Sequence, residues 1–165
     1  MRSAVGFSLT KWYIDCVSAD GRVAIGYWAS LAWGPLALTW HSVVLHAPGS
    51  GPDHRSSLIA VAAPDVRGRT LTWRAPALQC TVRADSRQRP FEERLLDDEA
   101  GVVHWRVEAP AANVRVELGG ASPISGPGYA ERIVLTAPPW RLPIRELRWG
   151  RWIDAAGNRS VVWID

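Results

Sequence analysis

The chain has 165 residues, of which ten are tryptophan, and it carries 19 basic against 16 acidic side chains. Hydrophobic residues make up 47% and charged residues 21%, which excludes a disordered, collagen-like or charge-extended chain. The length suits one domain, residues 1–165, with a substantial core. The basic residues are scattered and nearly all are Arg, so we expect solvated faces and no nucleic-acid partner.

The first predicted strands, residues 6–17, 23–32 and 36–46, are apolar on both faces. Asp20-Gly21 is a strong hairpin signal, and a second turn is expected at Trp33-Gly34-Pro35. Residues 23–45 contain no charged side chain and are long enough to span a bilayer. Their Gly, Pro, Ser, Thr and His residues favour two buried strands instead, so we expect no integral membrane span.

Polar and apolar residues alternate over 70–75, 78–84, 103–107 and 114–118, which predicts strands with one solvated face. Loops are expected at 47–57, 97–101, 109–112 and 119–127, and residues 88–98 could hold one short helical turn. A turn at 155–158 leads to a last strand at 161–164. About ten short strands with tight turns predict an all-β domain, either a closed antiparallel barrel or a sandwich.

Motifs for metal, phosphate or nucleotide binding are absent from the sequence, so we expect no metal and no cofactor. Cys16 and Cys80 could pair once. Residues 1–10 lack the continuous apolar core of a secretory signal, which favours a cytoplasmic location, with peripheral membrane contact left open.

Glu131 is the first candidate for chemistry. In a strand that begins at Gly128, alternation places Tyr129, Glu131 and Ile133 on the more apolar face. Burial disfavours the charged carboxylate, and a carboxylic acid that stays protonated can donate a proton. The alternative is a structural ion pair, for example with Arg148 or Arg151 on a neighbouring strand.

Asp15 is the second candidate, because Asp is disfavoured inside strands and this one lies between apolar neighbours. It shares one strand face with Tyr13, whereas Trp12 and Cys16 share the other. Either Asp15 places a polar group in a cavity, or it makes a structural hydrogen bond to a neighbouring Tyr or Trp.

Tryptophan falls on almost every predicted strand. Large rings pack irregularly and make good walls for an apolar ligand, so we predict an aromatic-lined pocket. The predicted ligand-binding residues are Trp12, Tyr13, Trp28, Trp40, His41, Trp140 and Trp149.

Two motifs bracket most of the chain. They are Trp12-Tyr13-x-Asp15 with Asp20-Gly21, and Gly126-x-Gly128-Tyr129-x-Glu131 followed by Pro139-Trp140 and Trp149-Gly150. Both resemble motifs of the carotenoid 1,2-hydratase (hydroxyneurosporene synthase) group, which is related to tocopherol cyclase and other lipocalin-like proteins of the calycin type. The resemblance implies a single antiparallel lipocalin-like barrel of about eight to ten strands with an apolar interior.

The resemblance also implies acid catalysis on an apolar, isoprenoid-like or polycyclic substrate by a cofactor-free hydratase, cyclase or isomerase. Glu131 would donate the proton, and Tyr129 and Asp15 would orient it or the water. A non-catalytic carrier of an apolar small molecule is the alternative. Members of the group usually contain two such barrels, so a homodimer of this chain is a further expectation.

Overall fold

The computed structural model describes residues 6–143, 145–154, 156 and 158–165. In this part of the chain the fold is all-β, with two three-residue 3-10 helices and no α-helix. The strands are β1 (Phe7–Val17), β2 (Val23–Trp33), β3 (Leu36–His46), β4 (Asp53–Ser57), β5 (Asp65–Arg67), β6 (Thr70–Ala75), β7 (Cys80–Ser86), β8 (Phe91–Asp98), β9 (Gly101–Leu118), β10 (Ile124–Leu135), β11 (Trp149–Ile153) and β12 (Ser160–Ile164).

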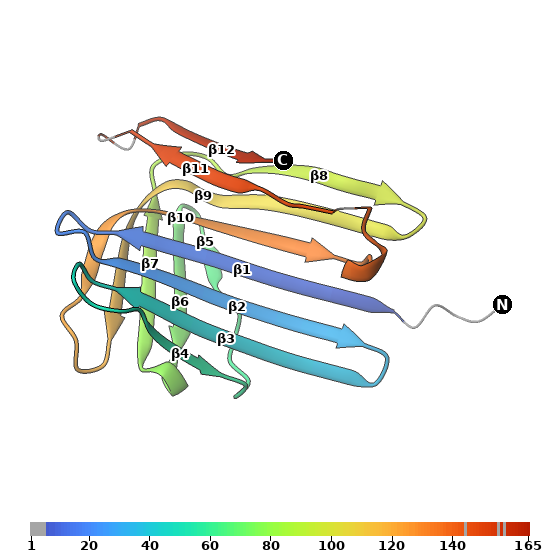
Figure 1. Ribbon diagram of the computed structural model, residues 1–165. Helices are drawn as coiled ribbons and strands as arrows, with labels where there is room; N and C mark the ends of the chain where they lie inside the picture. The colour runs from blue at the N-terminus through green and yellow to red at the C-terminus, as the bar shows by residue number, and fades with distance from the viewer. Residues whose placement is uncertain (1–5, 144, 155, 157) are drawn as a thin grey trace.

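Ten strands form one antiparallel sheet in the order β4-β3-β2-β1-β10-β9-β7-β6-β5, and β8 pairs with the first half of β9. The sheet curls, so that β5, β6 and β7 lie behind β1, β2 and β3 in Figure 1. The space between these two halves holds the main core, which includes Trp12, Trp28, Trp73 and Val82. This arrangement confirms the predicted all-β antiparallel architecture.

The hydrogen-bonded path ends at β4 and β5 in the described residues. The segment between them covers this side of the core: Val61 packs against it, and the Val61 carbonyl accepts a 3.0 Å hydrogen bond from Trp28 Nε1. The apolar rings of the core are therefore packed against side chains and backbone.

β9 is a single bent strand of 18 residues, so the predicted turn at 109–112 is wrong. The pairing of β9 with β10 shifts register at Gly128–Ala130 and again at Ala130–Glu131, opposite the buried Pro110. Proline cannot donate to a sheet ladder, and a bulge accommodates it while bending the strand. The bend therefore lies directly beside Tyr129 and Glu131.

Other expectations differ in detail. Residues 88–98 contain strand β8 rather than a helical turn; its exposed charges form cross-strand ion pairs such as Arg106–Glu92, at 2.6 Å. The predicted loop 47–57 contains β4, and β10 begins at Ile124, inside the predicted loop 119–127. The hairpin turns are confirmed: Gly21 and Gly34 have φ of 80° and 59°, which glycine adopts without a Cβ clash. Residues 155 and 157 of the predicted last turn, and residues 1–5, lie outside the described part.

The β11–β12 hairpin lies over the other face of the sheet, above β1, β9 and β10 (Figure 1). Trp149, Val162 and Ile164 of this hairpin pack on a second buried cluster that contains Trp105 and Tyr129. Because hairpin and core cover opposite faces of β1, that strand is apolar on both. Neither short helix of the described residues could cross a membrane.

Candidate functional site

The pairing of β1 with β10 brings the two sequence motifs together. Tyr13 is the register partner of Glu131, and Asp15 is the partner of Tyr129. All four side chains lie on the face of the sheet that the β11–β12 hairpin covers. Strand alternation predicted that Tyr13 shares a face with Asp15 and that Tyr129 shares a face with Glu131. The register places these two predicted pairs side by side.

Glu131 is buried, with 7% of its surface exposed. Its Oε2 atom accepts a 2.7 Å hydrogen bond from Trp105 Nε1 and a 2.8 Å hydrogen bond from the Tyr129 hydroxyl. The described residues donate no hydrogen bond to Oε1. Two donors on one oxygen suit a carboxylate acceptor, and Oε1 is the oxygen that could carry a proton without disturbing either hydrogen bond.

Tyr129 is fully buried at the centre of the site. Burial, followed by the nearby charge of Glu131, raises the pKa of its hydroxyl well above the ordinary value, so the group stays a donor. Its ring contacts Trp149 and Tyr13, with centroids 5.6 and 6.4 Å away. Tyr129 therefore links the carboxylate to the aromatic underside of the hairpin.

Asp15 holds the hairpin to the sheet. Arg151 of β11 donates from Nε to Asp15 Oδ2 at 2.7 Å and from Nη2 to Oδ1 at 2.5 Å. The Tyr13 hydroxyl adds a 3.1 Å bond. Burial raises the pKa of Asp15, and Arg151 opposes that effect. Of the two arginines considered as partners for Glu131, Arg151 binds Asp15 instead, and Arg148 pairs with Glu146 at 2.9 Å.

An aromatic row continues from this site across β1, β2 and β3. The Tyr13 ring lies 5.1 Å from Trp149 and 5.3 Å from Tyr27, and Tyr27 lies 6.3 Å from Trp40. Of the predicted ligand-binding residues, Tyr13, Trp40 and Trp149 therefore lie on the same face as Glu131.

The other predicted ligand-binding residues lie elsewhere. Trp12, Trp28 and His41 are buried on the opposite face of the sheet. Trp140 is 63% exposed and packs on Phe7 and Trp33 at 5.8 and 5.1 Å. The tryptophans thus divide between two sides of the sheet, and they do not enclose one cavity around Glu131.

Two residues of the site, Trp105 and Arg151, did not emerge as site residues from the sequence. The alternation of Val103, Trp105 and Val107 marks a core face, and a buried indole N–H needs an acceptor. The acceptor is Glu131. The sequence alone does not identify this partner, because it depends on the register between β9 and β10, which is shifted by two bulges. The partner of Arg151 lies 136 residues away and could not be read from local spacing.

An apolar cavity of about 340 Å³ lies on the same face of the sheet as Glu131. It begins at the next residue of β10 that points to this face. Ile133, the neighbour of Glu131 on that face of β10, lines it, as does Lys11, the neighbour of Tyr13 on β1. The complete lining is Leu9, Lys11, Leu95, Leu96, Val103, Ile133, Leu135, Leu142, Pro143, Leu147 and Ile164. Glu131 itself is not part of this lining. We call this space the hairpin cavity.

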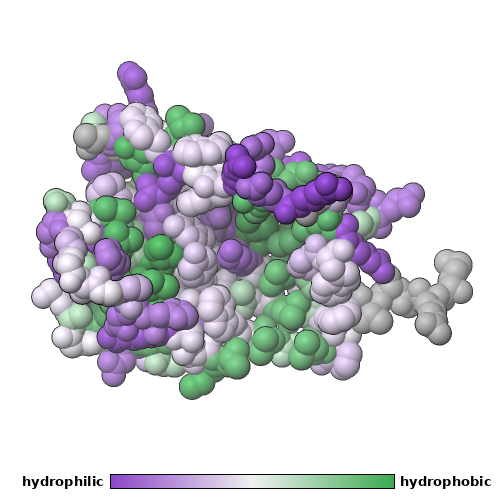
Figure 2. Space-filling view, viewed as in Figure 1, coloured by the Kyte–Doolittle hydropathy of each residue, from purple (hydrophilic) through white to green (hydrophobic). Residues whose placement is uncertain are grey.

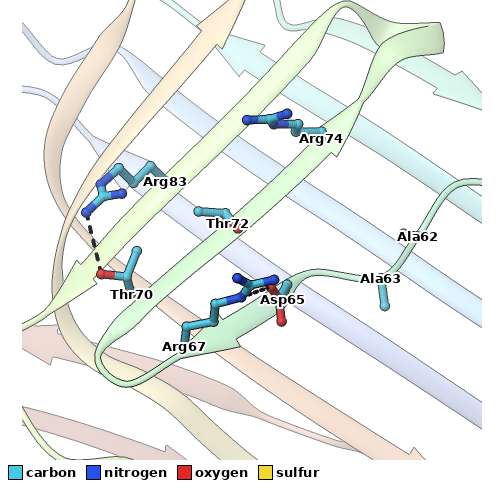
Figure 3. A pocket seen from close by; sticks show the side chains of 8 residues that line it. All are labelled: Ala62, Ala63, Asp65, Arg67, Thr70, Thr72, Arg74 and Arg83. Carbon is cyan, nitrogen blue, oxygen red and sulfur yellow. Dashed lines mark hydrogen bonds and ion pairs between the residues drawn. The ribbon is translucent and has the colours of Figure 1, made fainter.

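Two further hollows are polar. Figure 3 shows the larger, about 600 Å³, on the outer surface of β5, β6 and β7. Two of its arginines are neutralised there: Arg67 pairs with Asp65 at 2.8 Å, and Arg83 pairs with Asp85 at 2.7 Å. Arg74 is the third arginine of this groove.

The second polar hollow, about 450 Å³, lies beside Trp12. Its buried Glu108 pairs with Arg106 at 3.0 Å and with Arg132 at 3.4 Å, and Arg132 stacks 5.5 Å from the Trp12 ring. Arg132 therefore points away from Glu131, as strand alternation predicted.

The remaining candidates for chemistry are metal-ligating side chains and the two cysteines of the described residues. No group of three or more His, Cys, Asp or Glu side chains there could hold a metal ion. Cys16 and Cys80 are free and buried. Burial raises the pKa of Cys16 to about 11 and that of Cys80 to about 12, so both thiols stay protonated.

Comparison with known proteins supports the fold. No protein-family model matches the chain, and no curated protein matches its sequence. Among solved structures, the chain is similar to a candidate AttH protein from Nitrosomonas europaea, with a TM-score of 0.52 and 15% sequence identity. The match covers 89% of this chain and 56% of that one, so this chain spans little more than half its length. The likeness concerns the fold and agrees with the lipocalin-like architecture expected from the sequence.

Proposed function

We propose that this chain binds an apolar small molecule in the hairpin cavity. The observation that carries the proposal is the lining, which consists of ten apolar residues and Lys11. Ligand sites are typically concave, mostly apolar and about 300–1,000 Å³ in volume. At about 340 Å³, the cavity equals roughly eleven water molecules of about 30 Å³ each. A small molecule, or one end of a longer one, fits this space.

The second candidate function is acid catalysis, favoured by the position of the buried Glu131 next to Ile133 of the cavity lining. A proton on Oε1 would be transferred to one carbon of a ligand C=C bond, whose π electrons form the new C–H bond. The neighbouring carbon becomes a cation, a water oxygen bonds to it, and the water's proton returns to Glu131. This sequence is a hydration; capture by an internal hydroxyl gives cyclisation, and loss of another ligand proton gives isomerisation.

Binding has the stronger support of the two functions. The Glu131 carboxyl does not line the hairpin cavity, and both hydrogen bonds donated to it suit its ionised form. Catalysis would require Oε1 to reach the ligand and to carry a proton. Trp105 and Tyr129 would then stabilise the carboxylate that forms when the proton leaves.

Binding can be tested with a neutral fluorescent probe, N-phenyl-1-naphthylamine. We expect its emission to rise with the wild-type chain and not with Leu135→Trp or Leu142→Trp, which fill the cavity. Leu36→Trp is the matched control, because Leu36 is 48% exposed on β3 and is not part of the lining. Equal probe binding by the wild-type chain and both cavity-filling variants would overturn the proposal.

Acid chemistry has its own test. Proton transfer to an alkene in deuterated water incorporates deuterium, which mass spectrometry detects on small isoprenoid alkenes. We expect incorporation with the wild-type chain and none with Glu131→Gln, while both still bind the neutral probe. Equal incorporation by the two chains would exclude Glu131 as the acid.

Self-association also stays a proposal. The outer face of the β11–β12 hairpin exposes Trp152, Val161 and Trp163 by 52%, 55% and 48%. Exposed apolar clusters of this kind often mark interaction surfaces. Light scattering at micromolar concentration tests it: a dimer that Trp152→Ser converts to a monomer supports the proposal, and a wild-type monomer contradicts it.

A further inference from the structure

We infer that the hairpin cavity takes an anionic amphiphile, an alkyl carboxylate whose chain fills the cavity and whose carboxylate binds Lys11. The inference rests on the proposed binding function and adds the chemical class of the ligand. It is carried by the position of Lys11, the single charged residue in an otherwise apolar lining.

Lys11 is the only lysine of the chain. Strand alternation places it between Leu9 and Tyr13 on the hairpin-covered face of β1, and its register partner on β10 is Ile133. The residue is exposed although it lines the cavity. Long basic side chains commonly bury the aliphatic stem and keep the charged end in water, so we place the Lys11 stem in the wall and its ammonium group in solvent beside the cavity.

Lys11 forms no ion pair with the carboxylates of the described residues. None of the ion pairs among the described residues includes it, and its ammonium lies 5.2 Å from the centre of the Tyr27 ring. A ring face attracts the cation without neutralising it. The buried carboxylates on the same face, Asp15 and Glu131, are already engaged by other donors. Lys11 is therefore available to an anionic ligand.

The remaining lining limits what can lie deeper in the cavity. Ten apolar residues offer no side-chain partner for hydroxyl or amide groups, so a sugar or nucleotide would leave buried polar groups unpaired. A carboxylate would likewise be disfavoured inside, but at the mouth it meets both solvent and Lys11. An alkyl chain suits the interior, and each buried methylene is expected to strengthen binding about fourfold.

The test compares decanoate with decan-1-ol, which share one chain and differ in charge. Their affinities are measured by displacement of N-phenyl-1-naphthylamine near neutral pH and low salt. We expect decanoate to bind the wild-type chain about three- to fivefold more tightly than the alcohol, as for a solvent-exposed ion pair. Lys11→Gln should weaken decanoate binding more than decan-1-ol binding and so remove that preference, and Lys11→Arg should retain it. Added salt should reduce the preference in the wild-type chain.

The outcomes separate the two proposals. If the wild-type chain binds both ligands equally, or if Lys11→Gln weakens both equally, the inference is wrong and the apolar binding site stands. If neither ligand displaces the probe, and the probe itself does not bind, the proposed function fails. Unchanged thermal unfolding of the exposed Lys11 variants confirms that they remain folded.

Discussion

Arg151 of β11 forms a bidentate ion pair with Asp15 of β1, which joins the C-terminal hairpin to the first strand of the sheet. The side chains of both residues are largely buried, at 16% and 6% exposure. The pair gives a physical reason for an aspartate in the middle of an apolar strand. The pair lies on the same hairpin-covered face of the sheet as Glu131 and the hairpin cavity.

Removing Arg151 should destabilise the fold strongly. Arg151→Ala leaves the Asp15 carboxylate buried without its main partner, which typically costs about 3–5 kcal/mol. Urea unfolding monitored by circular dichroism measures the loss. Arg148→Ala is the matched control, since Arg148 forms a largely exposed pair and should cost under about 1 kcal/mol. Similar losses in the two variants would contradict a buried docking role for Arg151.

Acid should partly rescue Arg151→Ala. Burial raises the pKa of Asp15, and loss of Arg151 removes the principal opposing effect. A carboxyl whose pKa is higher in the folded than in the unfolded state favours folding when protonated, and loses that advantage as pH rises through the folded pKa. The stability difference between the variant and the wild-type chain should therefore shrink as pH falls toward the ordinary carboxyl range. A difference that grows on acidification would refute this account of Asp15.

Tyr129 and Trp105 should act on Glu131 as a coupled pair, because both donate to Oε2. Each of Tyr129→Phe and Trp105→Phe removes a hydrogen bond to a charged group, which is worth about 1.5–3 kcal/mol; the smaller ring of Trp105→Phe adds a packing loss. A double-mutant cycle measured by urea unfolding should show a non-additive interaction of at least about 0.5 kcal/mol. Strict additivity would mean that the two donors do not share the carboxylate.

His41 should make the fold sensitive to mild acid. Its ring is fully buried, both ring nitrogens lack a partner among the described residues, and burial lowers its pKa. The unfolded chain binds a proton near the ordinary pKa of about 6.5 while the folded chain does not, so stability falls as pH drops below about 6.5. We expect His41→Leu to reduce this slope in urea midpoints, and the exposed-residue control His46→Gln to retain it. An unchanged slope in His41→Leu would assign the effect to other groups.

Cys16 and Cys80 should be unreactive in the folded chain. Burial covers both thiols and raises their pKa to about 11 and 12, so little thiolate forms near neutral pH. A colorimetric thiol reagent should label neither residue until guanidinium chloride unfolds the chain, and then both. Rapid labelling of the native chain would show that one of these core regions opens readily.

Strand periodicity predicted much of the fold and part of the site. The alternation around Asp20-Gly21 identified β1 and β2, and it placed Tyr13 with Asp15 and Tyr129 with Glu131. It could not tell which face of β1 is the interior, because both faces are apolar. The structure resolves this: Trp12 faces the main core, and Tyr13 faces the hairpin.

Long-range pairing accounts for what the sequence did not predict. Pro110 indicates a turn by local rules, yet the bulges of the β9–β10 ladder keep it inside a bent strand. The charges of β8 obscured a strand that pairs across to β9. The lining of the hairpin cavity comes from β1, β8, β9, β10, β12 and the segment before β11. These elements are far apart in the sequence, so no local sequence pattern could predict the cavity.

Exposed hydrophobic residues also lie outside the hairpin cavity. Figure 2 shows hydrophobic residues along the lower edge of that view, over β3, where Leu36 and Leu38 are 48% and 41% exposed. An apolar ligand could adhere there without using the hairpin cavity. A decisive measurement must therefore report where the ligand is bound.

Methyl-resolved NMR during titration with decan-1-ol is that measurement. The account predicts saturable shifts at the methyl groups of Ile133, Leu135 and Ile164, which line the hairpin cavity. Shifts confined to Ile14, Val43 and Val82 of the main core, or to Leu36 and Leu38 at the sheet edge, would contradict it.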